Sequence, residues 1–147
     1  MVEVVRSILK VKHTDVWSIG PDAVVYEAIA MMADKGVGAL PVLDGDKLMG
    51  ILSERDYARR VILQGRSSRE TRVSEIMTSS VITVTPDNTV TECLEIMTNH
   101  RIRHLPVVEG EKLVGIVSIG DLVKAIVSAQ EYAISQMSGY IAGDYPK

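Results

Sequence analysis

The sequence predicts an α+β protein made of two β-α-β-β-α repeats that pack as a pseudo-twofold pair, with an extra helix at the C-terminus. Three observations lead to this prediction. The chain of 147 residues repeats itself after 65 positions. Within each copy, short apolar stretches typical of strands alternate with apolar residues at the three- and four-residue spacing of helices. A half of about 60 residues is near the lower limit of independent stability, so we expect one shared core.

The repeat is carried by residues of very different chemistry. Leu40-Pro41-Val42 aligns with Leu105-Pro106-Val107, and the match continues without a gap to Asp56 and Asp121. Chance does not align so many unlike residues. The predicted organisation is repeat 1 over residues 6–65, a linker over 66–72, repeat 2 over 73–127, and a C-terminal helix and tail over 128–147.

Each copy begins with a short strand-forming stretch, 16–19 or 81–85, which ends at a Gly-Pro or Thr-Pro boundary. An amphipathic helix is predicted to follow, because apolar residues then recur at helical spacing. In the second copy Thr89 and Glu92 form a capping box, whereas Val24 at the matching position cannot cap. The apolar positions are Val25, Ala28, Ile29 and Met32 in the first copy and Val90, Cys93, Leu94 and Met97 in the second.

A β-hairpin with a Gly-containing turn is predicted next in each copy. A second helix begins near Ser53 or Ser118, and Gly65 is predicted to end the first of these helices. Helical spacing continues to Ile141, which predicts an extra helix for packing or dimerisation. The predicted strands are 39–43 and 48–52, then 105–108 and 113–117, and the tail 143–147 is expected to be loose.

The composition excludes several classes of protein. A net charge of -3 argues against a nucleic-acid partner and against binding to an anionic membrane. The single cysteine, Cys93, excludes an internal disulfide and a Cys-based zinc cluster and fits a reducing, cytoplasmic location. The three histidines lack metal-ligand spacing, so no metal is assigned. No P-loop, dinucleotide-binding or nucleophile-elbow motif is present, and we expect no enzyme activity.

The proline boundaries, the Leu-Pro-Val stretches, and the segments Gly-Ile-Leu-Ser-Glu-Arg-Asp (50–56) and Gly-Ile-Val-Ser-Ile-Gly-Asp (115–121) resemble the cystathionine β-synthase (CBS) domain. The resemblance covers roughly residues 6–127 and is to a stand-alone tandem pair, often called a Bateman module. It implies a non-catalytic sensor that binds an adenosine-containing ligand in the cleft between the repeats. AMP is the first expectation, with ATP, ADP, NAD(H) or S-adenosylmethionine as alternatives, and no catalytic cofactor. The resemblance also implies a homodimer and an unidentified regulated protein as partners.

The resemblance assigns ribose binding to Asp56 and Asp121. A carboxylate accepts hydrogen bonds only, which suits a vicinal diol, and a helix N-terminus favours a phosphate. In the second copy Arg103 and His104 stand where the first has Gly38 and Ala39, so the two sites are not equivalent. Ribose or phosphate contacts are expected from Ser53, Ser118, Arg55, Arg103 and His104. Base contacts, largely through the backbone, are expected from Ile19, Gly38, Ala39, Leu40, Pro41, Thr83, Ile102, Leu105 and Pro106.

Structural alternatives remain open for these residues. Ser-x-x-Asp at a helix start is also a capping motif, and ribose binding and capping can coexist. The six arginines between Arg55 and Arg72 read as a solvated face, with Arg55 as the exception. A ligand-free dimerisation or protein-interaction module is the alternative function.

Overall fold

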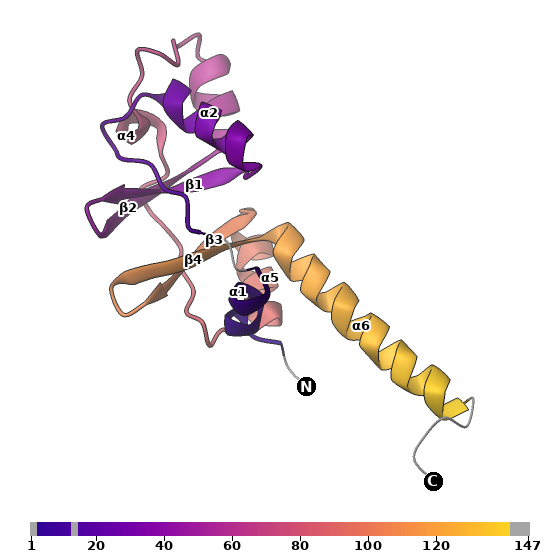
Figure 1. The fold of residues 1–147 in the computed structure, drawn as a ribbon. Coiled ribbons are helices and arrows are strands. Elements are labelled where there is room, and N and C mark those ends of the chain that lie inside the picture. The colour runs from indigo at the N-terminus through magenta and orange to yellow at the C-terminus, as the bar shows by residue number, and fades with distance from the viewer. Residues whose placement is uncertain (1–2, 13–14, 142–147) are drawn as a thin grey trace. The chain divides into compact units, whose positions relative to one another are not determined.

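The computed structural model describes residues 3–12 and 15–141. Contacts divide the chain into two compact units, which are described separately. Of the described residues, the α6 unit contains 3–12, 86–105 and 117–141, and the β1 unit contains 15–85 and 106–116. In chain order (Figure 1) the elements are α1 (Val5–Lys12), α2 (Val25–Lys35), β1 (Ala39–Asp44), β2 (Lys47–Ser53), α3 (Glu54–Tyr57), η1 (Ala58–Ile62), α4 (Val73–Ile76), α5 (Val90–His100), β3 (His104–Glu109), β4 (Lys112–Ser118) and α6 (Ile119–Ile141).

The β1 unit is built on the antiparallel hairpin of β1 and β2. Its register runs from Ala39 opposite Ser53 to Asp44 opposite Lys47, with an irregularity after Val42. Gly45 closes the turn at a φ of 62°, which a side chain would disfavour. The hairpin positions α2 and α4 around one apolar core. Its buried members are Ile19, Val25, Ala28, Met32, Leu40, Val42, Leu52, Val61, Val73 and Ile76.

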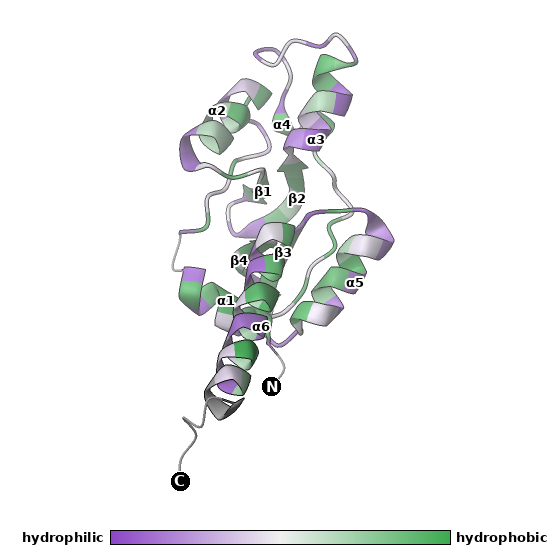
Figure 2. Cartoon of the chain, turned by 90° about the vertical axis from the view of Figure 1, so that its right-hand side faces the viewer, coloured by the Kyte–Doolittle hydropathy of each residue, from purple (hydrophilic) through white to green (hydrophobic). Residues whose placement is uncertain are grey.

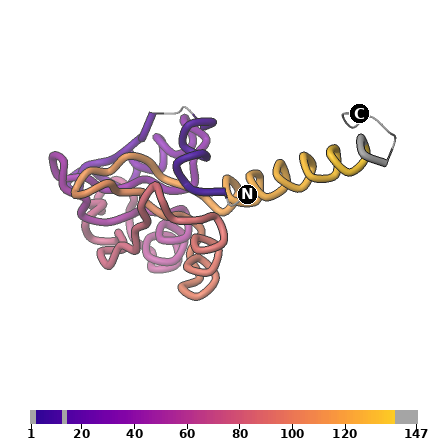
Figure 3. The backbone as a smooth tube through the Cα atoms, turned by 90° about the horizontal axis from the view of Figure 1, so that it is seen from below, coloured from indigo at the N-terminus to yellow at the C-terminus, as the bar shows by residue number. Residues whose placement is uncertain are grey.

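Helices α1 and α6 belong to the α6 unit together with α5. The Val5 amide donates to the Asn88 carbonyl (2.9 Å), and the Val90 amide donates to the Glu3 carbonyl (3.0 Å). These bonds hold the start of α1 against the start of α5. Helix α6 runs without interruption for 23 residues (Figure 3). The buried apolar side chains of this unit are Val5, Ile8, Val90, Cys93, Met97, Leu105, Val117 and Leu122.

The compact units do not follow the repeats along the chain. Helix α1 lies at the start of the first copy but packs with α5 and α6 of the second. Helix α4 lies at the start of the second copy, yet Val73 and Ile76 are buried in the core of the β1 unit. The helix at the start of each copy does not cover the apolar surface of its own copy. It covers the apolar surface of the other copy instead.

The α+β class, both hairpins and both amphipathic helices are confirmed. Thr89 caps α5 through the predicted box, and α2 begins at Val24 without a side-chain cap. The expected first strand of each copy is reduced to a single parallel bridge, from Ile19 to Val42 and from Val84 to Val107.

The helices after the hairpins also follow the prediction in outline. After Ser53, α3 passes into the π-helical segment η1, which ends shortly before Gly65 in the left-handed region. The extra C-terminal helix is a direct continuation of the second helix of repeat 2. The predicted loose tail, 143–147, lies outside the described residues. Over the ranges that the structure describes, no helix is long and apolar enough to cross a bilayer.

Candidate functional site

In the β1 unit, Asp56 lies at the N-terminus of α3 within a capping box. The Ser53 amide and the Ser53 hydroxyl both donate to Asp56 Oδ2, at 2.9 and 3.1 Å. The Asp56 amide in turn donates to Ser53 Oγ (3.1 Å). The capping interpretation of Ser-x-x-Asp is therefore confirmed at this position, and the carboxylate is held in one orientation.

Other predicted residues lie directly beside this box. Ala39 pairs with Ser53 in the hairpin, and the Gly38 carbonyl accepts a hydrogen bond from the Glu54 amide (3.0 Å). Thr78 donates its hydroxyl to Asp56 Oδ1 at 3.3 Å. The fold thus brings the backbone before Leu40 next to the capping box that contains Asp56.

In the α6 unit, Asp121 occupies the equivalent place at the start of α6. The Ser118 amide donates to Asp121 Oδ2 (2.9 Å), and the Asp121 amide donates to Ser118 Oγ (3.1 Å). The Arg103 carbonyl accepts from the Ile119 amide (2.9 Å), which matches the bond from Glu54 to Gly38. The second capping box is therefore also confirmed, and Arg103 lies beside it through its backbone.

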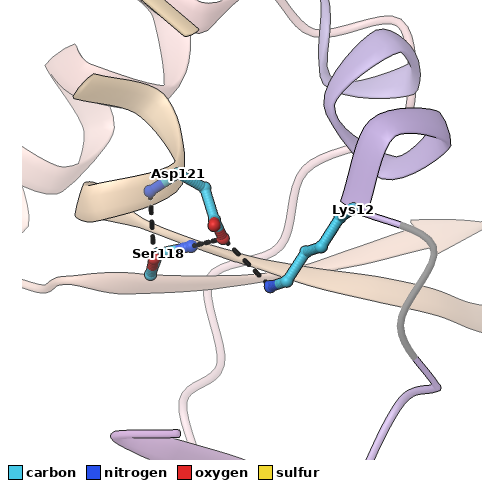
Figure 4. A network of polar contacts seen from close by, with 3 residues as sticks. All are labelled: Lys12, Ser118 and Asp121. Carbon is cyan, nitrogen blue, oxygen red and sulfur yellow. Dashed lines mark hydrogen bonds and ion pairs between the residues drawn. The ribbon is translucent and has the colours of Figure 1, made fainter. Parts of the chain in front are cut away.

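Asp121 has a partner that Asp56 lacks. Lys12, the last residue of α1, donates from Nζ to Asp121 Oδ2 at 3.0 Å, across 109 residues of sequence (Figure 4). Burial by itself raises the pKa of Asp121. Hydrogen bonds from the Ser118 amide and Lys12, and the positive charge of Lys12, outweigh burial and hold that pKa below its ordinary value. Asp121 is therefore ionised, and the ammonium of Lys12 balances its negative charge.

Sequence reasoning missed both Lys12 and Thr78. The residue 65 positions after Lys12 is Met77, so internal symmetry gave no reason to expect a lysine at this site. The available signal was the amphipathic spacing of Val5 and Ile8, which would have identified α1 and placed its last residue near a partner element.

A cavity of about 410 Å³ lies between α1 and α6, next to the pair formed by Lys12 and Asp121. Its wall carries two ammonium groups, from Lys12 and Lys124. Ile8, Val11 and Ala125 supply apolar surface. Ser7, Ser128 and the carboxylates of Glu3 and Asp121 complete the lining. The cavity thus combines two ammonium groups, two carboxylates, hydroxyl donors and apolar surface within one unit.

The remaining predicted residues lie in varied surroundings. The Pro41 carbonyl accepts from the Ile19 amide (3.1 Å), and the Pro106 carbonyl accepts from the Val84 amide (3.0 Å). Leu40 and Leu105 are fully buried in their units, so only their backbone could meet a ligand. The side chains of Arg103 and Thr83 are exposed, and those of Arg55, Ile102 and His104 are half-buried.

The arginines after Asp56 make contacts within the β1 unit. Arg60 donates to the carbonyls of Ile76 (2.9 Å) and Met77 (3.2 Å), at the end of α4. Three further arginines have side-chain partners: Arg66 pairs with Glu75 (2.7 Å), Arg72 with Asp22 (3.4 Å), and Arg69 lies 3.9 Å from the centre of the Tyr26 ring. These contacts give four of the six arginines a structural role.

Cys93 is fully buried on α5, and burial raises the pKa of its thiol, which agrees with a core position. Within residues 3–12 and 15–141, no group of three or more His, Cys, Asp or Glu side chains is arranged to hold a metal ion.

Comparison with known proteins gives close relatives. The CBS domain model matches residues 5–63 and 73–128. The mitochondrial CBS domain-containing protein CBSX3 of Arabidopsis thaliana is 43% identical over 129 residues, which cover 84% of this chain and 63% of that protein, less than two thirds of its length. CBS domain-containing protein YhcV of Bacillus subtilis is 36% identical over 137 residues, covering 93% of this chain and 90% of the relative.

Solved structures agree. A protein with CBS domains from Burkholderia ambifaria has a TM-score of 0.83 and 51% identity, covering 86% of this chain and 96% of the other. The CBS domain pair of protein MJ0100, in complex with 5′-methylthioadenosine and S-adenosylmethionine, has a TM-score of 0.75 and 26% identity, covering 88% and 99%. A hexameric CBS-CP12 protein from bloom-forming cyanobacteria has a TM-score of 0.74 and 26% identity, covering 95% and 90%. This chain therefore belongs to the CBS domain family and carries the domain twice, as a tandem pair.

Proposed function

We propose that the protein is a non-catalytic regulatory module that binds an adenosine-containing ligand, AMP in the first instance, through the carboxylates of Asp56 and Asp121. The observation that carries the proposal is the repeated arrangement of one carboxylate at a helix start beside the backbone that precedes Leu-Pro. Occupancy would favour one arrangement of the chain and so alter the surface offered to a regulated protein.

The chemistry of both carboxylates suits a ribose. Each carboxylate has about four lone-pair positions, and the cap uses only part of them. At Asp121 no described residue donates to Oδ1, which leaves that oxygen for a hydroxyl. The MJ0100 pair, which holds two adenosine compounds, supports this class of ligand. The choice of AMP within the class rests on the resemblance alone.

The test is thermal unfolding of the full chain, freed of co-purified ligand, with AMP, ADP, ATP, NAD, NADH or S-adenosylmethionine. Ligand at 100 times its dissociation constant adds about 2.7 kcal/mol, which raises the midpoint by several degrees. Asp56→Asn and Asp121→Asn each keep one amide oxygen for the cap but lose the second acceptor, so the shift should fall in the variant whose half binds ribose. Asp46→Asn, in the exposed turn of the first hairpin, is the charge-matched control.

A midpoint that no ligand moves, in protein shown to be folded and empty, would contradict nucleotide binding. The protein would then be the interaction module that the sequence left as the alternative. Turnover of a nucleotide that is lost in Asp121→Asn would contradict the non-catalytic assignment.

We also propose that the protein forms a homodimer through α6. Val123, Val127, Ile134 and Met137 are between 45% and 63% exposed and follow one side of this helix. Their spacing is that of a heptad seam, with Val127 and Ile134 at one core position and Val123 and Met137 at the other. Green, apolar stretches appear along α6 among polar ones in Figure 2. An apolar seam of this length needs a cover, and a second copy supplies an identical one.

The charges on α6 favour an antiparallel partner. Lys124 and Glu131 are seven residues apart and hold the same position flanking the seam. In an antiparallel pair this position faces its own counterpart, so Lys124 of each copy meets Glu131 of the other. In a parallel pair Lys124 and Glu131 would instead face the position on the other side of the partner's seam. Ile126 and Ala133 occupy that position and carry no charge. The hexameric CBS-CP12 protein supports self-association as a property within the family.

A further inference from the structure

The Asp121 carboxylate is partly occupied by a group of the protein itself. Oδ2 accepts two hydrogen bonds, from the Ser118 amide and from Lys12 Nζ, which fill both lone pairs of that oxygen. A vicinal diol needs one acceptor for each hydroxyl. In the bidentate mode, with one hydroxyl on each oxygen, Oδ1 takes the first hydroxyl and the second reaches Oδ2 only if Lys12 leaves it.

Lys12 is suited to such an exchange. It is the last residue of α1, its ammonium is a compact charge on a flexible four-carbon stem, and its side chain is 28% exposed. The Ser118 amide, in contrast, is fixed in the backbone of the cap and cannot move away. Of the two donors on Oδ2, the lysine is therefore the one that a ligand displaces.

The displaced Lys12 ammonium can bind a ligand in the cavity between α1 and α6. The cavity of about 410 Å³ beside the pair is lined by the ammonium groups of Lys12 and Lys124, the carboxylates of Glu3 and Asp121, and the hydroxyls of Ser7 and Ser128. The two carboxylates balance the two ammonium groups while Lys12 stays on Asp121. When a diol occupies the Asp121 carboxylate, a phosphate can replace that carboxylate as the partner of Lys12, with the two hydroxyls as further donors.

We propose that Lys12 is an exchangeable occupant of Asp121: an adenosine ligand displaces it from Oδ2, and the freed ammonium binds the phosphate of that ligand in the α1–α6 cavity. The site at Asp121 thereby selects phosphorylated adenosine compounds over adenosine and over the cationic S-adenosylmethionine. The inference rests on the proposed function and deepens it. It also moves the phosphate from Arg103 and His104, where sequence reasoning put it, to α1.

The first repeat supplies the comparison within the same molecule. Met77 stands 65 positions after Lys12, and Asp56 receives a neutral donor, the Thr78 hydroxyl. The Asp56 half has no lysine to displace at the matching position and no ammonium there to give to a phosphate. Lys12→Met therefore gives the second half the same residue, methionine, that the first half has at the matching position.

The experiment is titration calorimetry of the full chain with AMP, adenosine and S-adenosylmethionine, in an Asp56→Asn background that weakens the first half. With Lys12 present, AMP is expected to bind more tightly than adenosine. Lys12→Met should weaken AMP about tenfold, the usual loss for one charge-assisted hydrogen bond, while adenosine and S-adenosylmethionine bind as tightly as before or more tightly. The ratio of AMP to adenosine affinity is the readout, since a general loss of structure would weaken both.

Two controls complete the design. Lys10→Met removes the same charge from an exposed position of α1 and should leave the ratio unchanged. Lys12→Arg keeps the charge and should retain most of the preference for AMP, which serves as the test should Lys12→Met fail to fold. An unchanged ratio in Lys12→Met, or an equal loss for both ligands, overturns the inference alone. Absence of binding by all three ligands in the unmutated chain overturns the proposed function and the inference with it.

Discussion

Ile51 and Thr78 exchange two backbone hydrogen bonds, at 3.0 and 2.9 Å, and so fix the segment after α4 to the edge of β2. This pairing brings the backbone so close that Gly50 has no room for a side chain. A Cβ at Gly50 would lie 2.7 Å from both Met77 Sδ and the Thr78 carbonyl oxygen. The methionine can move, but the carbonyl belongs to the pairing and cannot.

Gly50→Ala is therefore expected to destabilise the protein by about 1–3 kcal/mol, the usual cost of overpacking. Urea unfolding followed by circular dichroism measures the change. Gly20→Ala is the matched control, because nothing lies within 4 Å of a Cβ at that position. It should stay within about 0.5 kcal/mol of the parent. Equal stability of the two variants would show that the segment after α4 is not held against β2.

The capping boxes offer a test that uses the repeat itself. Glu92 accepts from the Thr89 amide (2.8 Å), and Thr89 Oγ1 accepts from the Glu92 amide (3.0 Å). In the first copy Glu27 is present three residues after Val24, but valine has no oxygen to complete the box. Val24→Thr should stabilise the protein by about 0.5–1 kcal/mol, and Thr89→Val should cost about 1 kcal/mol. Chemical denaturation measures both, and opposite signs are required.

The sequence predicted these features because they depend on short separations. The 65-residue repeat located the hairpins, and the box of Thr89 and Glu92 spans only three residues. The exchange of α1 and α4 between the copies could not be predicted in this way. Both helices carry apolar positions that fit either copy, and only the tertiary fold decides which core each helix enters.

The same limit explains the site. Asp56 and Asp121 were predicted as ligand residues from the family resemblance of a motif that spans only a few residues, and that role stays a prediction. Lys12 was missed because its bond to Asp121 joins residues 109 apart, and nothing in the sequence separates Lys12 from Lys10 on the same helix. Arg103 was predicted to contact a phosphate from its charge and its place before Leu-Pro. The fold uses its carbonyl at the helix start and leaves its side chain exposed, and the phosphate contact stays a prediction.

Asp121 should make stability depend on acid pH. Its pKa is lowered in the folded state, because burial is outweighed by the Ser118 amide and Lys12. The stabilisation is therefore present above the unfolded pKa, about 3.9, and is lost as the pH falls through the lower folded value. Asp121→Asn should cost about 1–2 kcal/mol at pH 7, and the difference from the parent should shrink below about pH 4.

Urea unfolding at a series of pH values measures this difference. Asp46→Asn, exposed in the hairpin turn, should show no such trend. Lys12→Met should raise the pKa of Asp121, observed by NMR titration of the carboxyl carbon, while Lys10→Met should not change it. A pKa of Asp121 that is the same with and without Lys12 would contradict the ion pair in solution.

A single charged substitution in the apolar seam of α6 tests the proposed dimer. Ile134 is 61% exposed, and in the proposed antiparallel dimer it packs opposite Val123 of the second copy. Burying an aspartate there without a partner costs several kcal/mol, more than one end of a short helical interface supplies, so Ile134→Asp should yield a monomer. Sedimentation equilibrium gives the mass of the parent and of the variant.

Gln136→Asp is the control, because Gln136 is exposed and two residues along a helix turn the side chain about 160° away from Ile134. It should keep the mass of the dimer.

The predicted pair of Lys124 with Glu131 tests the relative orientation of the two helices. Lys124→Glu and Glu131→Lys should each weaken the dimer, and the double exchange should restore it. Restoration fails in a parallel pair, where the two residues never meet, so the charge exchange decides the orientation as well as the interface.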